Sequence, residues 1–323
     1  MLEVMLMLSL VTALLIVRER SVIRMVIYLG VFSLFSAVIY LLLGSPDVAM
    51  AEAIISAFST ILFIVCIEKY YRRRAFKEGE RPRYRNAFSW LKRFLAPFLG
   101  CTFLFLGVVL FLPDTEVSTY LRDLYILNAW RDVGGENVVG AIVLGYRVYD
   151  TLFEALILII SVVAVGHMSW YSSDSTDKGH HSKIERSSMA LFATKIIAPL
   201  MLIFSVYLVL NGHISAGGGF QAGVAAASFF VCRYMVYNIY DIPIKKVMRL
   251  EEIIFISMVF VAVLAIFIGP FGQLAIGNLP YFQEAYLIAM NAMIGLKVSC
   301  GFFLLFYRYI AIEKLDTDVQ SER

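Results

Sequence analysis

The sequence has little charge and few cysteines, and both shortages exclude whole classes of protein. Charged residues make up only 16% of the 323 residues, hydrophobic residues make up 60%, and the mean hydropathy is +0.78. Ordinary soluble domains carry about 25% charged residues. The cysteines stand singly in apolar runs, with no C-x-x-C pair and no histidine at ligand spacing, at positions Cys66, Cys101, Cys232 and Cys300. A disulfide framework or a zinc site is therefore not expected.

Long apolar runs occupy most of the chain and predict an all-α polytopic membrane protein with nine transmembrane helices. Their expected limits are 2–17, 22–43, 47–68, 94–112, 148–168, 188–210, 220–238, 252–269 and 285–307. The first run lacks a basic start and a small-residue cleavage site, so we expect a retained transmembrane helix and not a signal peptide. Residues 137–147 are apolar but broken by glycine, and are expected to form a short separate helix lying along or entering the membrane.

The distribution of Lys and Arg predicts the orientation of the helices. Basic residues far outnumber acidic ones in the connector at 69–93, which the positive-inside rule places in the cytoplasm. The same choice puts the carboxyl terminus inside, and the amino terminus and the acidic connector at 113–136 outside. The basic connector also suits a contact with anionic lipid or with a partner protein, although its role in topology is explanation enough.

Composition divides the chain into three membrane blocks, at 1–93, 94–187 and 188–323. A polar linker at 169–186 leads into the third block and carries His180 and His181. We interpret this histidine pair as part of a solvated linker, with metal binding as the alternative. Since the chain offers no soluble domain of useful size, any redox cofactor or nucleotide is expected on another chain.

A glycine-rich stretch at residues 211–223 lies between two of the predicted helices. Gly217, Gly219 and Ala222 fit the spacing of the G-x-G-x-x-A dinucleotide fingerprint, but that motif needs a short strand before it. The apolar run that precedes the stretch is too long for a strand. We therefore expect a tight outer turn, in which Gly217, Gly218 and Gly219 let two membrane helices approach.

Two carboxylates stand near the start of the third predicted helix. Asp47 follows Pro46, where a carboxylate caps a helix, and this structural role explains it without a transport role. Glu52 lies about 7 Å deeper in the membrane, at about 1.5 Å per residue. A cap cannot explain Glu52, so we expect it to serve a proton or ion pathway or to form half of a structural ion pair.

Asp150 and Glu154 are four residues apart, which stacks their carboxylates on one face of the fifth predicted helix. Two like charges in a low dielectric do not both ionise readily, so the pair suits a proton relay. The alternative is that Asp150 pairs with Arg147 at the membrane surface, while Glu154 meets a lysine of another helix.

Lys297 lies near the middle of the last predicted helix, too deep to reach water, and is the best basic candidate for a proton path. A fixed bridge to a carboxylate is the alternative. Lys195 and Arg233 lie nearer helix ends and are expected to snorkel to the surface, although Lys195 and Asp47 are kept among the candidates for the ion or proton pathway. His213, at the outer mouth of the sixth and seventh helices, can change protonation near neutral pH or can serve as a satisfied structural histidine.

Three motifs carry a resemblance to fused membrane subunits of Mrp-type cation/proton antiporters and of membrane-bound hydrogenases. The block from residue 188 onward resembles the antiporter B subunit, through Asn211-Gly212-His213 and Gly217-Gly218-Gly219-Phe220-Gln221. The run from Ser45 to Glu52 resembles the carboxyl-terminal part of the antiporter A subunit. Asn137-Val138-Val139, followed by Tyr149 to Glu154, is similar to the next piece of that region and, more faintly, to a proton-channel subunit of respiratory complex I.

The resemblance implies a subunit of an ion-translocating complex in the cytoplasmic membrane of a prokaryote. The expected partners are membrane lipid, other antiporter subunits and, in a redox-driven complex, hydrogenase or other redox subunits. Binding to nucleic acid is not expected. Na⁺ and H⁺ would be the transported ions, with no cofactor on this chain. Ala216 and Ala222 replace a proline and a glycine of the family, and the large antiporter-like domain of the A subunit is absent. The chain is therefore expected to be one module of a larger complex.

Two further hypotheses stand beside a transport module. The chain can be a structural adaptor that joins larger antiporter and redox subunits, in which case its membrane charges are fixed pairs. An intramembrane enzyme is the third hypothesis. It is the weakest, because the predicted spans carry no Ser/His, paired catalytic aspartate or metal-ligand motif.

Overall fold

The computed structural model describes residues 1–75, 98–107, 119–171, 188–237, 244–268 and 280–311. Every regular element in these ranges is a helix. The helices are α1 (Leu2–Arg18), α2 (Val22–Leu42), α3 (Pro46–Ala75), α5 (Tyr120–Val133), α6 (Val138–Ala141), the π-helix η1 (Ile142–Tyr146), α7 (Val148–Tyr171), α8 (Ser188–Asn211), α9 (Gly219–Tyr237), α10 (Ile244–Ile268) and α11 (Pro280–Ala311). Residues 98–107 are also helical.

The prediction of an all-helical membrane protein is confirmed. In the described ranges, six helices are long and apolar enough to cross a membrane, namely Val22–Leu42, Pro46–Ile67, Val148–Gly166, Leu191–Asn211, Gly219–Val236 and Gln283–Tyr307. The described residues are helical at each of the nine positions predicted to span the membrane, and the span predicted at 94–112 is described only at 98–107. The number of spans and their orientation stay predictions. The basic connector beyond residue 75 and the pair His180 and His181 lie outside the described residues.

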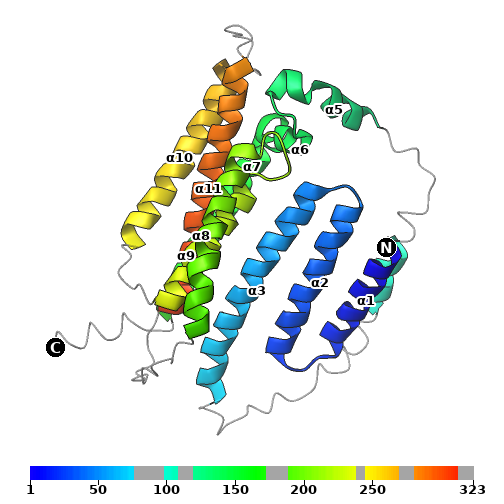
Figure 1. The fold of residues 1–323 in the computed structure, drawn as a ribbon, viewed down its shortest axis with the longest axis vertical. Helices are drawn as coiled ribbons and strands as arrows, with labels where there is room; N and C mark the ends of the chain where they lie inside the picture. Colours follow the sequence, from blue (N-terminus) through cyan, green and yellow to red (C-terminus); the bar gives the residue numbers. More distant parts are fainter. Residues whose placement is uncertain (76–97, 108–118, 172–187, 238–243, 269–279, 312–323) are drawn as a thin grey trace, which may run out of the picture.

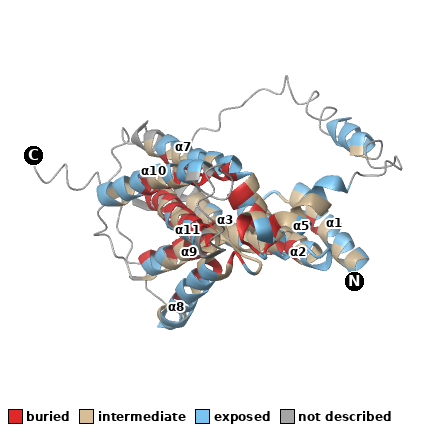
Figure 2. Cartoon of the chain, turned by 90° about the horizontal axis from the view of Figure 1, so that it is seen from above, coloured by how far each residue is buried: buried red, intermediate tan, exposed pale blue. Residues whose placement is uncertain are grey.

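The helices form two groups that meet along α3 (Figure 1). In the first group, α2 packs between α1 and α3. In the second group, α11 packs against α7, α8, α9 and α10, and α3 joins the two groups through contacts with α9 and α11. Within the protein, 61% of the most apolar part of α11 is buried, whereas the corresponding fraction is 6% in α2 and in α3. The core therefore surrounds α11, as the buried residues in Figure 2 show.

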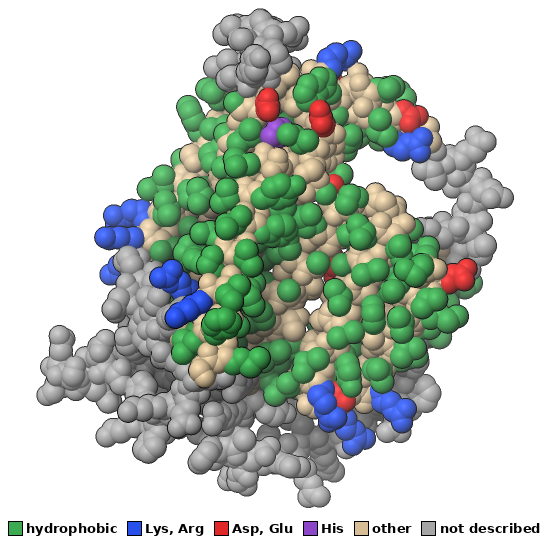
Figure 3. Space-filling model, in the orientation of Figure 1, with side chains coloured by type: hydrophobic (Ala, Val, Ile, Leu, Met, Phe, Trp, Pro, Cys, Tyr) green, Lys and Arg blue, Asp and Glu red, His purple; other side chains and the backbone are tan. Residues whose placement is uncertain are grey.

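The surface matches the sequence-based expectation for a membrane protein. Apolar side chains cover the middle of the visible face, whereas charged side chains lie mostly around its edges, with several acidic side chains and the histidine near the upper end and basic side chains at the left, at the lower end and also at the upper end (Figure 3). The upper end holds the α2–α3 turn and the loop at residues 211–218 (Figure 1). We call it the outer end, because the charge pattern predicts that it faces the outside.

Glycines allow α9 and α11 to pack closely. A Cβ atom on Gly219 would overlap the backbone oxygen of Asn291, and one on Gly223 would lie 2.6 Å from Cβ of Val298. Such contacts are closer than side chains tolerate, so α9 and α11 approach as small-residue membrane helices do. The predicted glycine turn lies just before them, where Gly217 and Gly218 have φ values of +151° and +143°.

The segment predicted as a short separate helix at 137–147 forms α6 and η1. Asn137 begins it by accepting hydrogen bonds from the backbone N–H groups of Val139 and Gly140. The π-helical turn shifts the backbone hydrogen bonds, as π-bulges do. Two hydroxyls bond to its carbonyl oxygens: Thr151 Oγ1 donates to Val143 O at 2.7 Å, and Tyr286 Oη donates to Leu144 O at 3.0 Å. These bonds fix η1 against α7 and α11.

Candidate functional site

Lys297 lies at the centre of the bundle and is fully buried, with 0% of its surface exposed. Its ammonium nitrogen is 3.5 Å from Oε1 of Glu251 on α10, and it donates a hydrogen bond to the backbone oxygen of Ala155 on α7. At this distance the two groups form an ion pair, because 3.5 Å is longer than an ordinary hydrogen bond. Oε1 of Glu251 has no hydrogen-bond partner among the described residues. The carboxylate partner that the sequence left open for Lys297 is thus Glu251.

Space for the Glu251 carboxylate comes from a glycine on α11. A Cβ atom at Gly301 would lie 3.2 Å from Oε1 of Glu251 and 2.8 Å from Cδ2 of Leu158 on α7. A larger residue at Gly301 would therefore push against both neighbouring helices. The charged pair occupies a site where α7, α10 and α11 meet, and each of the three contributes an atom to it.

Asp150 and Glu154 lie on the exposed side of α7, one helical turn apart. The carboxylate of Asp150 forms an ion pair with Arg147, as the alternative interpretation of Asp150 expected. Glu154 is also exposed and has no hydrogen bond or ion pair with another described residue. The structure therefore separates the two carboxylates by environment: Asp150 is neutralised at the end of the helix, whereas Glu154 faces away from the bundle.

Glu52 lies between α2 and α3, half-buried, where Ser33 Oγ donates a 2.6 Å hydrogen bond to its Oε1. A carboxylate so placed is held by a neutral hydroxyl, and the described part of the chain contains no basic partner for it. Lys195 is exposed on α8 and Arg233 is exposed on α9, in keeping with the expectation that both snorkel. The roles of Glu52 and Lys195 in an ion pathway stay predictions.

A network at the outer end joins three segments that are distant in sequence; we call it the outer clasp and define it as Asp47, Asn137 and the loop 211–218. Asp47 Oδ1 accepts hydrogen bonds from Asn137 Nδ2 at 3.0 Å and from the backbone nitrogen of Gly217 at 3.1 Å. The capping of α3 by Asp47 stays a prediction, and the structure shows that Asp47 fixes the glycine loop to α3.

Asn137 is the centre of the outer clasp. Its Nδ2 also donates to the backbone oxygens of Gly212 at 3.2 Å and Ser215 at 2.9 Å, and its backbone nitrogen donates to the oxygen of His213 at 3.0 Å. The same side chain caps α6 through its oxygen. One buried asparagine thus satisfies backbone groups of both α6 and the loop, which explains why an amide serves here and a carboxylate would not.

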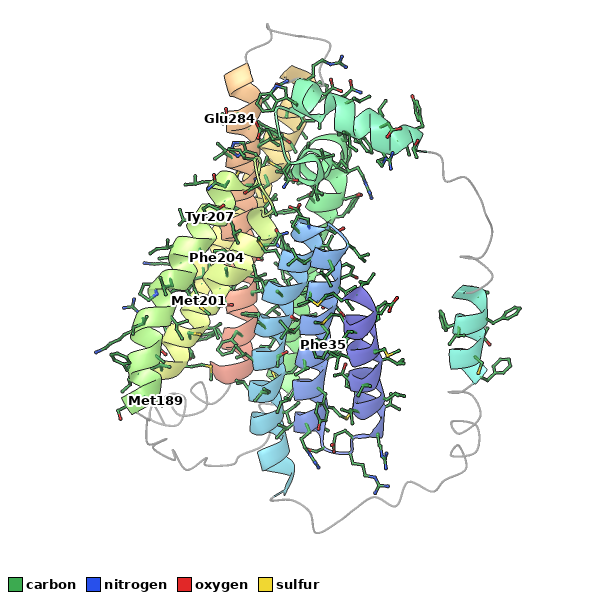
Figure 4. The ribbon with its side chains drawn as sticks, turned by 45° about the vertical axis from the view of Figure 1, so that its right-hand side comes forward. Phe35, Met189, Met201, Phe204, Tyr207 and Glu284 are labelled. Carbon is green, nitrogen blue, oxygen red and sulfur yellow. The ribbon has the colours of Figure 1, made fainter. Side chains whose placement is uncertain are left out.

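His213 belongs to the loop that the outer clasp holds, and it contacts α11. Its ring nitrogen Nε2 is 3.2 Å from Oε1 of Glu284, which lies at the outer end of α11 (Figure 4). A second polar residue on α11, Asn291, accepts a hydrogen bond from the backbone nitrogen of Gly219 at 2.9 Å, at the start of α9. Glu284 and Asn291 were not predicted as site residues.

No group of three or more His, Cys, Asp or Glu side chains in the described ranges could hold a metal ion. The polar residues described above instead lie in separate places, namely the outer clasp with His213 and Glu284, the Lys297–Glu251 pair, Glu52 between α2 and α3, and Glu154 on the exposed side of α7.

Two protein-family models match the chain. Residues 7–72 match the model for the D subunit of MBH, and residues 189–304 match a domain related to the MnhB subunit of Na⁺/H⁺ antiporters. The two matches fall inside the first and third predicted blocks, although the boundaries of those blocks stay predictions.

Named relatives of the chain include proteins called antiporter subunits. The chain is 26% identical over 238 residues to a probable K⁺/H⁺ antiporter A/B subunit of Rhizobium meliloti (strain 1021), covering 65% of this chain and 23% of the relative. It is 29% identical over 153 residues to a putative antiporter protein, mnhA2, of Staphylococcus saprophyticus, covering 47% of this chain and 18% of the relative. The chain therefore spans less than a quarter of the length of these relatives.

Two solved membrane complexes contain chains of similar fold. One is the Mrp complex from Dietzia sp. DQ12-45-1b, with a TM-score of 0.72 and 19% identity over 95% of this chain and 34% of that chain. The other is the membrane-bound sulfane sulfur reductase, an archaeal respiratory membrane complex, with a TM-score of 0.54 and 25% identity over 67% of this chain and 96% of that chain. The chain is thus a multi-pass membrane protein that is similar to Mrp-type antiporter subunits.

Proposed function

We propose that the chain is the membrane module of a multisubunit cation/proton antiporter that exchanges Na⁺ for H⁺. The complex is either a stand-alone Mrp-type antiporter or the ion-translocating arm of a redox-driven complex. The observation that carries the proposal is the Lys297–Glu251 pair, buried where α7, α10 and α11 meet. The family models and the relatives named as antiporter subunits support the same function.

The pair favours transport because a purely structural pair would be a poor means of stabilising a bundle. Removing two charges from water costs several kcal/mol per ion, and well-packed apolar residues often do as well or better. An ionisable side chain within a membrane segment typically marks a substrate or proton path. Lys297 and Glu251 can exchange a proton between them, since one is a base and the other an acid.

Partner subunits are implied by Glu154. It lies six residues inside the apolar span Val148–Gly166, about 9 Å from the start of that span at 1.5 Å per residue, and it faces away from the bundle. A charged side chain at the centre of a membrane helix costs roughly 2.5 to 3.5 kcal/mol on insertion scales. We infer that another antiporter protein covers this face of α7 in the assembled complex.

The wider setting of the proposal follows from the relatives. The similarity to a respiratory membrane complex supports redox subunits as possible partners. The named relatives are bacterial, which supports the cytoplasmic membrane of a prokaryote as the location. Any redox cofactor would then belong to the partner subunits.

The test uses the whole complex, expressed in a host without its own antiporters. Neutral residues replace the charged pair in the double variant Glu251→Gln with Lys297→Met, which leaves no uncompensated charge. Transport through the pair predicts that Na⁺/H⁺ exchange in inverted vesicles falls at least about tenfold per assembled complex, since proton transfer by a positioned group contributes that much or more. Glu252→Gln, at an exposed neighbouring position on α10, is the matched control.

A structural adaptor is the second candidate, and one observation favours it: Lys297 donates a hydrogen bond to α7 and forms an ion pair with α10, and so links three helices. On this hypothesis, the variant Glu251→Gln with Lys297→Met exchanges ions at the wild-type rate whenever native gels show that it has assembled. The charge swap Glu251→Lys with Lys297→Glu should then restore any assembly that a single substitution loses. Wild-type exchange by the double variant would reject a transport role for the pair.

A further inference from the structure

The outer clasp holds the backbone of His213 in a fixed place. Asn137 bonds to the backbone oxygens on both sides of the residue and to the oxygen of His213 itself. The absence of a side chain at Gly140 allows α6 to lie close to the loop, because a Cβ atom on Gly140 would lie 3.1 Å from the backbone oxygen of Gly212. The imidazole ring therefore has a defined position relative to α11.

The two nitrogens of the His213 ring have opposite surroundings. Nε2 is 3.2 Å from the Glu284 carboxylate, a residue whose side chain is 46% exposed. Nδ1 is buried and has no hydrogen-bond partner among the described residues, and the whole residue is only 5% exposed. The ring thus stands between a group open to water and the closed interior of the protein.

The chemistry of the partner fixes the tautomer. An ionised carboxylate only accepts hydrogen bonds, so Nε2 carries the hydrogen and Nδ1 carries a free lone pair. A buried polar atom without a partner is uncommon in native proteins and calls for an explanation. A histidine kept only for packing would be expected to satisfy both nitrogens, as Asn137 satisfies all of its polar atoms nearby.

Other charged groups on the elements packed around the loop are already engaged or face water. Asp47 on α3 accepts two hydrogen bonds within the outer clasp. Asp132 on α5 is paired with a neighbouring arginine, and Glu136 in the turn before α6 is exposed. Of the described acidic residues, it is Glu284 that contacts the ring.

We propose that His213 is a proton relay between the outer aqueous phase and the interior of the module, with Glu284 as its partner at the surface. A proton that binds the Nδ1 lone pair makes the ring an imidazolium, and the Nε2 proton then passes to the Glu284 carboxylate. One proton enters and one leaves, and no electron moves. The ring is left as the Nδ1–H tautomer, and transfer of that proton through solvent to Nε2 restores the first tautomer. The reverse sequence carries a proton inward from Glu284.

This inference rests on the proposed function, and its test separates the two. The assembled complex is studied in inverted vesicles whose lumen, which corresponds to the outer side, is loaded at pH values from about 6 to 8. In His213→Gln the side chain can still bond to Glu284 but cannot carry a proton. The relay predicts that exchange per assembled complex falls at least about tenfold and no longer depends on the luminal pH.

Glu284→Gln tests the relay without changing a buried residue. Its side chain is partly exposed, so the variant should assemble, and slower exchange is expected because the surface acceptor is lost. Glu136→Gln removes an exposed carboxylate nearby and should retain the wild-type rate and pH dependence. Wild-type exchange and pH dependence in His213→Gln or in Glu284→Gln overturns the relay alone, whereas an assembled wild-type complex without any exchange overturns the proposed function.

Discussion

The ammonium group of Lys297 lies 3.5 Å from the carboxylate of Glu251, with one residue on α11 and the other on α10. Both side chains are shielded from water inside the bundle. Each charge makes the other tolerable, because an isolated charge in a protein interior is strongly unfavourable. The stability of the bundle is therefore expected to depend on keeping both charges or neither.

Replacing Lys297 alone by methionine should destabilise the module by about 3 to 5 kcal/mol, because it leaves Glu251 buried without a partner. Thermal unfolding of the purified complex in detergent measures the effect. Lys195→Met is the control: this lysine is exposed on α8, so the change should stay within about 0.5 kcal/mol. Equal stability of the two variants would show that Glu251 does not depend on Lys297.

Asn137→Asp should weaken the outer clasp at neutral pH and restore part of it on acidification. The new carboxylate would face Asp47, whose Oδ1 now lies 3.0 Å from Asn137 Nδ2, and two adjacent carboxylates repel. Below the shared titration range one of them is protonated and can donate to the other. The measurement is the hydrogen exchange rate of the backbone N–H of Gly217, given as the ratio of the variant's rate to the wild-type rate. This ratio should be larger at pH 7 than at pH 5, and an equal ratio at the two pH values would contradict the expectation.

Gly219→Ala should separate α9 from α11, since the added methyl group would overlap the backbone oxygen of Asn291. Overpacking of this kind typically costs about 1 to 3 kcal/mol. Gly100→Ala is a matched control, because nothing lies within 4 Å of a Cβ atom at that position. Melting temperatures of the two variants in the same detergent provide the comparison, and a Gly219→Ala protein as stable as the control would argue against close packing here.

Glu19 should stabilise the α1–α2 turn in a pH-dependent way. Hydrogen bonds from the backbone N–H of Ser21 and then of Arg20 hold the pKa of this carboxyl below its ordinary value of 4.5, and Arg24 lowers it further. Because folding lowers the pKa, the contribution is complete above about pH 4.5 and is lost as the pH falls through the lowered value. Hydrogen exchange of the Ser21 amide should be slower in wild type than in Glu19→Gln above pH 5, and the two should converge in stronger acid.

Much of the fold was predictable because membrane spans are long apolar runs, which the sequence shows directly. The prediction of 220–238, for example, matches α9 (Gly219–Tyr237) closely. The helix α10 begins at Ile244, before the membrane span predicted at 252–269, whose start was placed after basic residues that are typical of a connector. Glu251 was missed for that reason, since it fell one residue outside the predicted helix.

The candidate site was less predictable, because its contacts join segments that are far apart in the chain. Asp47 and Gly217 are 170 positions apart, and no local pattern relates them. Asp47 has a sufficient local explanation as a helix cap, which hid its second partner. Asn291 is a neutral side chain in an apolar run, and nothing in its neighbourhood in sequence distinguishes a hydrogen-bonding asparagine from an ordinary one.

The outer clasp also bears on how far the module depends on an unbroken chain. Asp47 lies in the region that matches one family model, and the loop 211–218 lies in the region that matches the other. The peptide between them acts as a tether, which raises the effective concentration of one region near the other without adding a contact. Two separate polypeptides carrying these regions would associate through the same hydrogen bonds. Their association would depend on protein concentration, whereas the contact within the single chain does not.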